Sequence, residues 1–279
     1  MEFTSADGER RWAELVRVAS RAVVGLDFDG TLSPIVDDPE AAHIHPDAGE
    51  VIVELAEVVR AVAVITGRPA RQVLDLGGLE QVGLALNGAG ADLFVFGQYG
   101  NERWSTTNRR IVSPRPPRGL ASFERELPGV LRRADAADAW IEDKGLAVAV
   151  HTRRLPDAEA AYQRLLPAVG DLAKRHDLLL EPGRQVIEVR SGGMHKGLAV
   201  RTLMEELGAG GFLFAGDDLG DLEAFEAVAE LRASGLPTVL VCSASEEESA
   251  LVERSDVVVK GPDGVLELLR RLTAEARSS

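Results

Sequence analysis

An apolar run near the start of the chain ends in two acidic residues, in the stretch Val23-Val24-Gly25-Leu26-Asp27-Phe28-Asp29-Gly30-Thr31-Leu32-Ser33. A continuous aliphatic run is typical of a strand buried on both faces of a parallel sheet. Open sheets of this kind bind ligands at the carboxyl ends of their strands. Two carboxylates placed there can act together, one attacking a substrate while the other transfers a proton. The stretch therefore indicates an aspartyl-phosphate site, with a solvated acidic turn as the simpler alternative.

Two further segments carry groups that can hold a phosphate. Thr66 and Gly67 directly follow the apolar run 61–65. A threonine hydroxyl can bind a phosphate oxygen there, and glycine lets the backbone approach the ligand closely. Lys196 begins a helical pattern, with Gly197 after it. At the N-terminus of a helix, a lysine can neutralise a phosphate dianion.

Three carboxylates follow a later apolar run, in the stretch Gly211-Phe212-Leu213-Phe214-Ala215-Gly216-Asp217-Asp218-Leu219-Gly220-Asp221. Carboxylates at this density repel one another unless a cation lies among them, and oxygen ligands suit Mg²⁺. Each segment alone has a simpler explanation, because Thr66 can cap a helix, Lys196 can lie at the surface, and aspartates favour helix N-termini. Their combination in one chain favours a shared site.

The apolar runs alternate with helical patterns along most of the chain. Such alternation is typical of a Rossmann-like α/β fold, in which helices cover both faces of a parallel sheet. We predict strands near 22–27, 61–66, 93–97, 212–216, 238–242 and 256–259.

A different rhythm begins after the proline-rich linker 113–117. There a helix is followed by two adjacent strands, and this unit occurs twice, at 119–151 and 157–190. An antiparallel sheet with helices on one face would bury such a pattern. We expect its turns at Lys144-Gly145 and Pro182-Gly183-Arg184. The predicted domains are a core of residues 1–108 and 191–279 and an inserted α+β cap of residues 109–190.

Charge and cysteine content limit the partners and the compartment. The 279 residues carry a formal net charge of -14, which argues against nucleic acid and anionic membranes as partners. The one cysteine, Cys242, cannot form an internal disulfide, and the first residues lack the pattern of a signal peptide. We expect a cytoplasmic protein that acts on a small molecule; a monomer is the simplest expectation for its oligomeric state.

The four segments resemble, in order, the motifs of the haloacid dehalogenase superfamily of phosphotransferases: Asp-x-Asp-Gly-Thr, Thr-Gly-Arg, Lys-Gly and Gly-Asp-Asp-x-x-Asp. Within that superfamily the chain is similar to trehalose-6-phosphate phosphatases. The similar segments are 27–36, 99–104, 142–147, 151–153 and 183–190. The resemblance implies a haloacid dehalogenase core with an inserted αββαββ cap, and hydrolysis of trehalose 6-phosphate to trehalose and phosphate.

Charge then suggests a role for each group of the core. A carboxylate attacks a phosphate dianion only where cations and N–H groups offset the repulsion. Our hypothesis makes Asp27 the nucleophile and Asp29 the acid and base that serves the leaving sugar and then the attacking water. Thr66, Gly67 and Lys196 would hold the phosphoryl oxygens.

Mg²⁺ is the expected cofactor. Its ligands would be the Asp27 carboxylate, the Asp29 backbone carbonyl and Asp217, with Asp218 reached directly or through water. Asp221 would orient Lys196 or a metal-bound water.

For the sugar, the resemblance carries over five charged cap residues: Glu142, Lys144, Arg153, Arg184 and Glu188. Without it, a solvated sheet face is the slightly better explanation of these charged residues. Two alternatives to the trehalose phosphatase stay open. One is a phosphatase for another sugar phosphate, such as that of sucrose, glucosylglycerol or mannosylglycerate. The other is a catalytically silent sensor of sugar phosphates.

Overall fold

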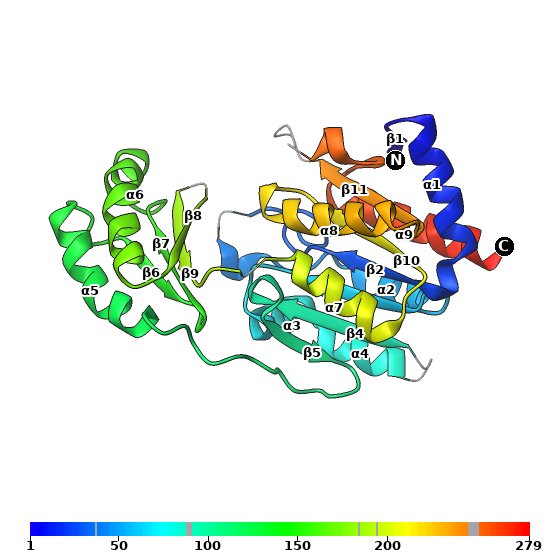
Figure 1. Cartoon of the computed structure of the whole chain (residues 1–279), viewed down its shortest axis with the longest axis horizontal. Helices are drawn as coiled ribbons and strands as arrows, with labels where there is room; N and C mark the ends of the chain where they lie inside the picture. Colours follow the sequence, from blue (N-terminus) through cyan, green and yellow to red (C-terminus); the bar gives the residue numbers. More distant parts are fainter. Residues whose placement is uncertain (37, 88–90, 184, 194, 245–250) are drawn as a thin grey trace. The chain divides into compact units, whose positions relative to one another are not determined.

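The chain consists of two compact units (Figure 1). The structure is a computed structural model, and it describes the chain except for residues 37, 88–90, 184, 194 and 245–250. Residues Met1–Ser113 and His195–Ser279 form the core unit, and Pro114–Met194 form the inserted unit. The sequence analysis placed the two boundaries at 108/109 and 190/191. The first observed boundary lies in a segment without regular structure, and at the second, Met194 lies outside the described residues.

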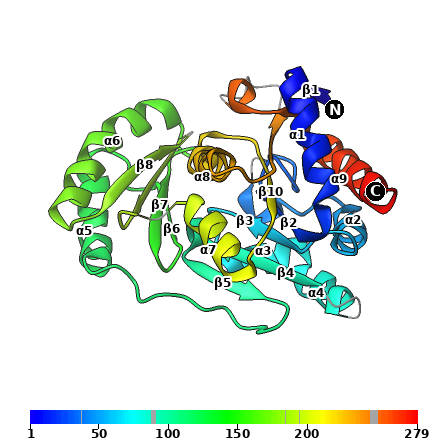
Figure 2. The same cartoon turned by 45° about the vertical axis from the view of Figure 1, so that its right-hand side comes forward.

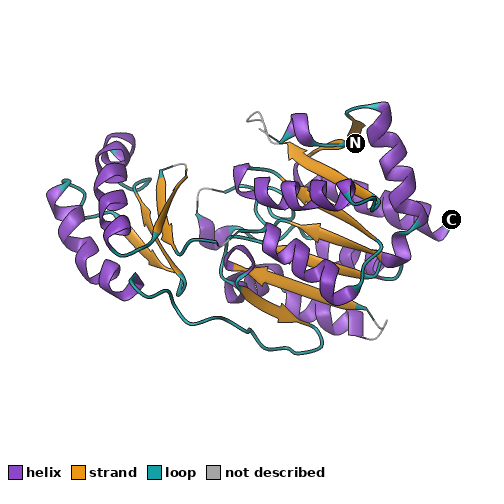
Figure 3. Ribbon diagram, in the orientation of Figure 1, coloured by secondary structure: helices purple, strands orange, loops and turns teal. Residues whose placement is uncertain are grey.

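A twisted sheet forms the centre of the core unit (Figure 3). Among the described residues its strand order is β1-β12-β11-β10-β2-β3-β4-β5. The six inner strands are mutually parallel, and the edge strands β1 and β5 are antiparallel to their neighbours. The strands are β1 (Glu2–Phe3), β2 (Ala22–Leu26), β3 (Ala61–Ile65), β4 (Asp92–Gly97), β5 (Glu102–Ser105), β10 (Gly211–Gly216), β11 (Thr238–Ala244) and β12 (Val257–Lys260).

Helices cover both faces of this sheet, as the continuous apolar strands require (Figure 2). Side chains alternate between two apolar layers, so that Val24 and Leu213 pack on one face and Val23 and Phe212 on the other. The first face is covered by α1 (Ala6–Arg17), α2 (Ala48–Ala56), α3 (Ala70–Gly77), α4 (Leu79–Asn87) and α9 (Gly261–Arg277). The second is covered by α7 (Gly197–Leu207) and α8 (Leu222–Ala233).

The predicted α/β class is confirmed, and all six predicted parallel strands are present. The antiparallel edge strands β1 and β5 were not predicted. β1 has only two residues, and β5, Glu102-Arg103-Trp104-Ser105, has polar residues at both ends. Neither strand is the apolar run by which buried strands are recognised in a sequence.

The inserted unit is a four-stranded antiparallel sheet with two helices. Its elements are α5 (Leu120–Arg133), β6 (Trp140–Asp143), β7 (Ala147–His151), α6 (Ala158–Arg175), β8 (Leu179–Gly183) and β9 (Val186–Arg190), and the strand order is β6-β7-β9-β8. Val148, Val150 and Ile187 point into one apolar layer with residues of α5 and α6. This arrangement confirms the predicted αββαββ pattern.

One predicted turn of this unit, Pro182-Gly183-Arg184, was wrong for its first two residues. Pro182 and Gly183 belong to β8 and pair with Ile187 and Val186, so the chain reverses after them. Proline is tolerated in β8 because that strand lies at the edge of the sheet, where a missing N–H disrupts no second neighbour. Arg184, the third residue of the predicted turn, lies outside the described residues.

None of the described helices is both long enough and apolar enough to cross a bilayer.

Leu165 on α6 tests the packing of the inserted unit. Its side chain is fully buried in the apolar layer, so Leu165→Ala should lower the free energy of unfolding by about 2–5 kcal/mol. Urea denaturation of the whole chain, followed by circular dichroism, measures this. The matched control is Leu179→Ala on β8, where the side chain is 50% exposed and the change should stay within about 0.5 kcal/mol. Equal losses in both variants would contradict the packing described.

Candidate active site

The carboxylate-bearing loops meet where the sheet reverses its strand order. β2 lies between β10 and β3 and is parallel to both. The Asp27 N–H, just past the end of β2, donates to the Ala215 carbonyl of β10 at 2.9 Å. This hydrogen bond places the two acidic segments side by side at the carboxyl edge, which is where open α/β sheets bind their ligands.

A buried lysine joins these segments. Lys196 lies at the N-terminus of α7, and its Nζ donates to Asp27 Oδ1 at 2.6 Å and to Asp221 Oδ1 at 2.7 Å. All three side chains are almost completely buried. The second oxygen of Asp221, Oδ2, accepts the backbone N–H of Asp217 at 3.0 Å. A hydrogen-bonded chain thus runs from the β2 loop through Lys196 and Asp221 to the β10 loop.

Gly30 makes room for the carboxylate of Asp217. A Cβ built on Gly30 would lie 2.1 Å from Asp217 Oδ2, and the φ of Gly30 is +68°. Both facts demand glycine at this position. The Gly30 carbonyl accepts the hydroxyl of buried Ser243, on β11, at 2.7 Å. Sequence reasoning missed Ser243, because nothing in its apolar strand marks the loop it contacts.

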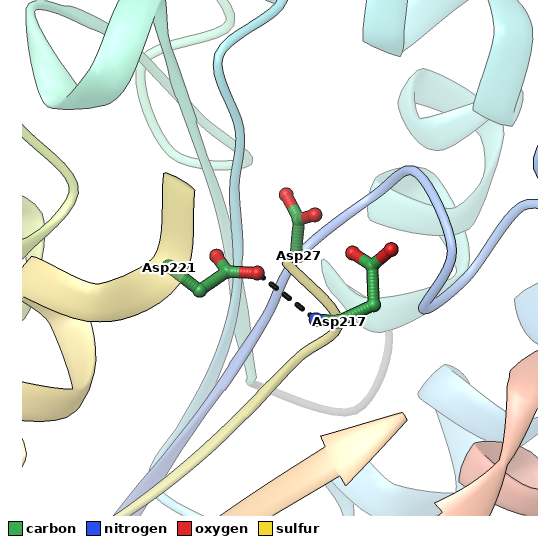
Figure 4. A group of neighbouring side chains, drawn as sticks. All are labelled: Asp27, Asp217 and Asp221. Atoms are coloured by element: carbon green, nitrogen blue, oxygen red, sulfur yellow. Dashed lines mark hydrogen bonds between the residues drawn. The ribbon is translucent and has the colours of Figure 1, made fainter. Parts of the chain in front are cut away.

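Asp27, Asp217 and Asp221 form a group that could hold a metal ion (Figure 4). One oxygen from each lies within 4.8 Å of the others. The donor set consists of carboxylate oxygens, which suit a hard divalent cation. Asp218 lies outside this group: it is exposed, and its Oδ1 accepts the Gly220 N–H at 2.8 Å, capping the short helix Leu219–Asp221.

Burial and mutual repulsion raise the pKa values of these carboxyl groups. The pKa of Asp27 lies well above its ordinary value because the group is buried and faces Asp221. Burial, Asp218 and Asp221 raise the pKa of Asp217 to about 8. Burial alone would lower the pKa of Lys196, but the carboxylates of Asp221 and Asp27 raise it well above its ordinary value. The lysine is therefore charged, and the acidic group still has excess negative charge that a cation would offset.

Thr66 and Gly67 follow β3, the strand on the other side of β2. Thr66 is buried, its N–H donates to the Phe96 carbonyl at 2.9 Å, and its Oγ1 accepts the Arg68 N–H at 3.1 Å. The loop is thus fixed by the backbone at the same edge of the sheet.

Asp29 has a different partner from Asp27. The Arg68 guanidinium donates to Asp29 Oδ2 at 2.6 Å and to Asp29 Oδ1 at 2.8 Å, and a third bond reaches the Pro39 carbonyl at 2.8 Å. The Asp29 side chain is 40% exposed. Sequence reasoning missed this bidentate ion pair, because the partners are separated by 39 residues and no local pattern links them.

Three of the residues expected to bind sugar lie close together in the inserted unit. Glu142 and Glu188 both face Ala149 across the strands β6-β7-β9. Lys144 Nζ donates to Glu188 Oε2 at 2.5 Å. Arg153 is exposed after β7, and Arg184 lies outside the described residues.

A histidine that the sequence analysis did not assign lies beside Glu142. His151 Nε2 lies 2.9 Å from Glu142 Oε2, and the His151 ring stacks on Trp140 with 4.4 Å between centroids. The strand register puts Trp140 opposite His151. This contact could have been found from the alternation of side chains, had the register been known.

The sheet, its acidic edge and the inserted unit together define the fold class. A mainly parallel sheet between helices, with an acidic edge and an inserted α+β unit, is the fold of the haloacid dehalogenase-like hydrolases. The solved structure of the C-terminal domain of trehalose-6-phosphate phosphatase from Candida albicans has the same fold. Its TM-score is 0.73, with 20% identity over 98% of this chain and 98% of that one.

The family follows from the sequence match. A family model described as trehalose-phosphatase matches residues 25–108 and 127–258. These ranges make up more than half of the chain, and the chain belongs to the trehalose-phosphatase family.

Two curated relatives from Mycobacterium tuberculosis are similar to this chain. One, named trehalose-phosphate phosphatase, is 30% identical over 80% of this chain and 54% of its own length. The other, named an uncharacterized glycosyl hydrolase, is 34% identical over 81% of this chain and 17% of its own length. The chain thus spans only about half or less of the length of these relatives.

Cation binding at the acidic group should depend on pH. Protons compete with a cation for Asp217, whose pKa is about 8, so the affinity for Mg²⁺ should rise as the pH rises from 6 to 8.5. Melting curves with Mg²⁺ or with a chelator measure this, and the stabilisation by Mg²⁺ should be larger at pH 8.5 than at pH 6. In an Asp217→Asn control the dependence on pH should weaken. A shift of the same size at every pH would contradict the account.

Proposed function

We propose that this chain is a Mg²⁺-dependent phosphatase that hydrolyses trehalose 6-phosphate to trehalose and inorganic phosphate. The observation that carries the proposal is the buried contact of Lys196 with Asp27 and Asp221 at the carboxyl edge of the sheet, in a chain of the trehalose-phosphatase family. This contact supplies a fixed carboxylate beside a positive charge.

Asp27 is the nucleophile in this proposal. The bond from Lys196 to its Oδ1 restricts the rotation of the carboxylate. An oxygen of Asp27 forms a bond to phosphorus, and the bond from phosphorus to the sugar oxygen breaks. Water then attacks the phosphorus of the aspartyl-phosphate, which frees inorganic phosphate and restores the carboxylate.

Asp29 moves the protons of both steps. It gives a proton to the departing sugar oxygen and later takes one from the attacking water. In the structure both of its oxygens accept from Arg68. Proton donation therefore requires that the carboxyl group leave this pairing, which its partial exposure permits.

The remaining core residues offset the charge of the substrate. Lys196 faces the phosphoryl group as it transfers, Thr66 offers its hydroxyl to the phosphoryl oxygens, and Gly67 offers its backbone N–H. The Asp27 carboxylate, the Asp29 carbonyl and Asp217 would hold Mg²⁺, with Asp218 reached directly or through water. When bound, Mg²⁺ would supply positive charge that lowers the repulsion between carboxylate and phosphate.

The inserted unit is proposed to select the leaving group. Glu142, Lys144 and Glu188 offer hydrogen-bond donors and acceptors that suit a polyhydroxylated ligand. Arg153 and Arg184 are proposed for the same sugar on the family resemblance. The cytoplasmic location expected from the single cysteine also remains a prediction.

A panel of sugar phosphates tests the substrate. With Mg²⁺ present, phosphate release should be fastest from trehalose 6-phosphate and slower from sucrose, glucosylglycerol, mannosylglycerate and hexose phosphates. The hydroxyls of another sugar lie in other positions and leave polar groups of the protein without hydrogen-bond partners. Specificity is measured as kcat/KM. Preference for another member of the panel would refute trehalose 6-phosphate as the substrate, and the absence of release from every member would favour the silent sensor.

Substitutions of the two aspartates test their roles. Asp27→Asn should abolish turnover of every substrate because no nucleophile remains. Asp29→Asn should lower kcat for trehalose 6-phosphate by about 10²–10⁴-fold, the usual contribution of a general acid and base. With p-nitrophenyl phosphate, whose leaving group needs no proton, formation of the aspartyl-phosphate should fall much less in Asp29→Asn.

Rapid quenching separates this first step from hydrolysis. Circular dichroism serves as the folding control for both variants. Substantial turnover by folded Asp27→Asn, or equal losses with both substrates in the first step of Asp29→Asn, would contradict the assigned roles.

A further inference from the structure

The turn after β4 is strained at two consecutive residues. Gln98 and Tyr99, in the short 3-10 turn Gln98–Gly100, have φ values of 50° and 58°. Residues with side chains rarely adopt this left-handed conformation, and glycine would adopt it without cost. Such strain persists where the surroundings impose it, and it is found most often at functional sites.

The surroundings of this turn are the two loops proposed to hold phosphate. On one side, the Tyr99 N–H donates to the Thr66 carbonyl at 3.0 Å and the Gln98 N–H donates to the Arg68 carbonyl at 2.9 Å. On the other side, a Cβ built on Gly100 would lie 3.3 Å from the Ala199 nitrogen in the first turn of α7. The turn therefore lies between the threonine loop and the helix that begins after Lys196.

The phenol ring of Tyr99 packs against Gly67. A Cβ built on Gly67 would be 2.8 Å from Tyr99 Cζ and 3.0 Å from the phenolic oxygen. The oxygen end of the ring thus occupies the space that a side chain at Gly67 would need, one residue after Thr66. Tyr99 is only partly buried.

We propose that Tyr99 is a substrate-contacting residue whose phenolic O–H donates a hydrogen bond to the phosphoryl group. The inference rests on the proposed function, since it takes Thr66 and Lys196 as the groups that hold phosphate. It explains why the chain keeps a large side chain at a left-handed position and glycine opposite it. It also extends the phosphate site to β4, a strand to which the sequence analysis gave no catalytic role.

The test uses the fact that the chain has only two tyrosines, Tyr99 and Tyr162. Tyr162 lies on α6 in the inserted unit, so Tyr162→Phe is a matched control for Tyr99→Phe. Protein labelled with ¹³C at the tyrosine ζ carbon is titrated with inorganic phosphate in the presence of Mg²⁺. The signal that Tyr99→Phe removes should move on saturation with phosphate, and it should still move in Tyr162→Phe.

Calorimetry on the same proteins measures the affinity for phosphate. The dissociation constant should rise about 10-fold or more in Tyr99→Phe, as expected for a hydrogen bond to a charged group, and should not change in Tyr162→Phe. A Tyr99 signal that stays in place, or an unchanged affinity in Tyr99→Phe, would overturn the proposal. The sugar panel is independent of this titration, so a different substrate would refute the proposed function without deciding the role of Tyr99.

Discussion

The ammonium group of Lys196 lies between two buried carboxylates, and the arrangement of the core site depends on it. Asp27 comes from the β2 loop and Asp221 from the segment after β10, so one cation holds two otherwise repelling loops together. Burial makes each charge expensive alone, and removal of one partner would leave the others uncompensated. The excess of negative charge over this single cation also explains why the same group offers a place for a divalent ion.

The parallel sheet brings such groups together from distant parts of the sequence. Each strand ends at the same edge, so Asp27, Thr66 and Asp217, which directly follow three adjacent strands, meet there although the chain separates them widely. Residues without chemistry of their own complete the site. Gly30 leaves space for a carboxylate, and Ser243 fixes the carbonyl of Gly30. The strained turn at Tyr99 fills the gap between the threonine loop and α7.

Much of the parallel sheet and of its acidic edge could be predicted, because hydrophobic runs and charged residues are local signals in the sequence. Buried strands are recognised by their aliphatic runs, and acids that interrupt such a run at its end are conspicuous. The Arg68 pairing with Asp29, the Ser243 contact and the position of Tyr99 could not be predicted, since each depends on register and backbone angles between distant segments. The prediction of a turn at Pro182 was wrong for a related reason. Only the sheet order shows that β8 is an edge strand, where proline is tolerated.

The account depends most on Asp27 as the group that accepts the phosphoryl group. A crystal structure of the chain soaked with Mg²⁺ and beryllium fluoride, a mimic of a phosphoryl group on a carboxylate, examines this directly. The account predicts a beryllium fluoride group bonded to an Asp27 oxygen, with Lys196 within hydrogen-bond distance of a fluorine and Mg²⁺ against Asp217. Beryllium fluoride bonded to Asp29 or to another residue, or bound only away from this edge of the sheet, would contradict it.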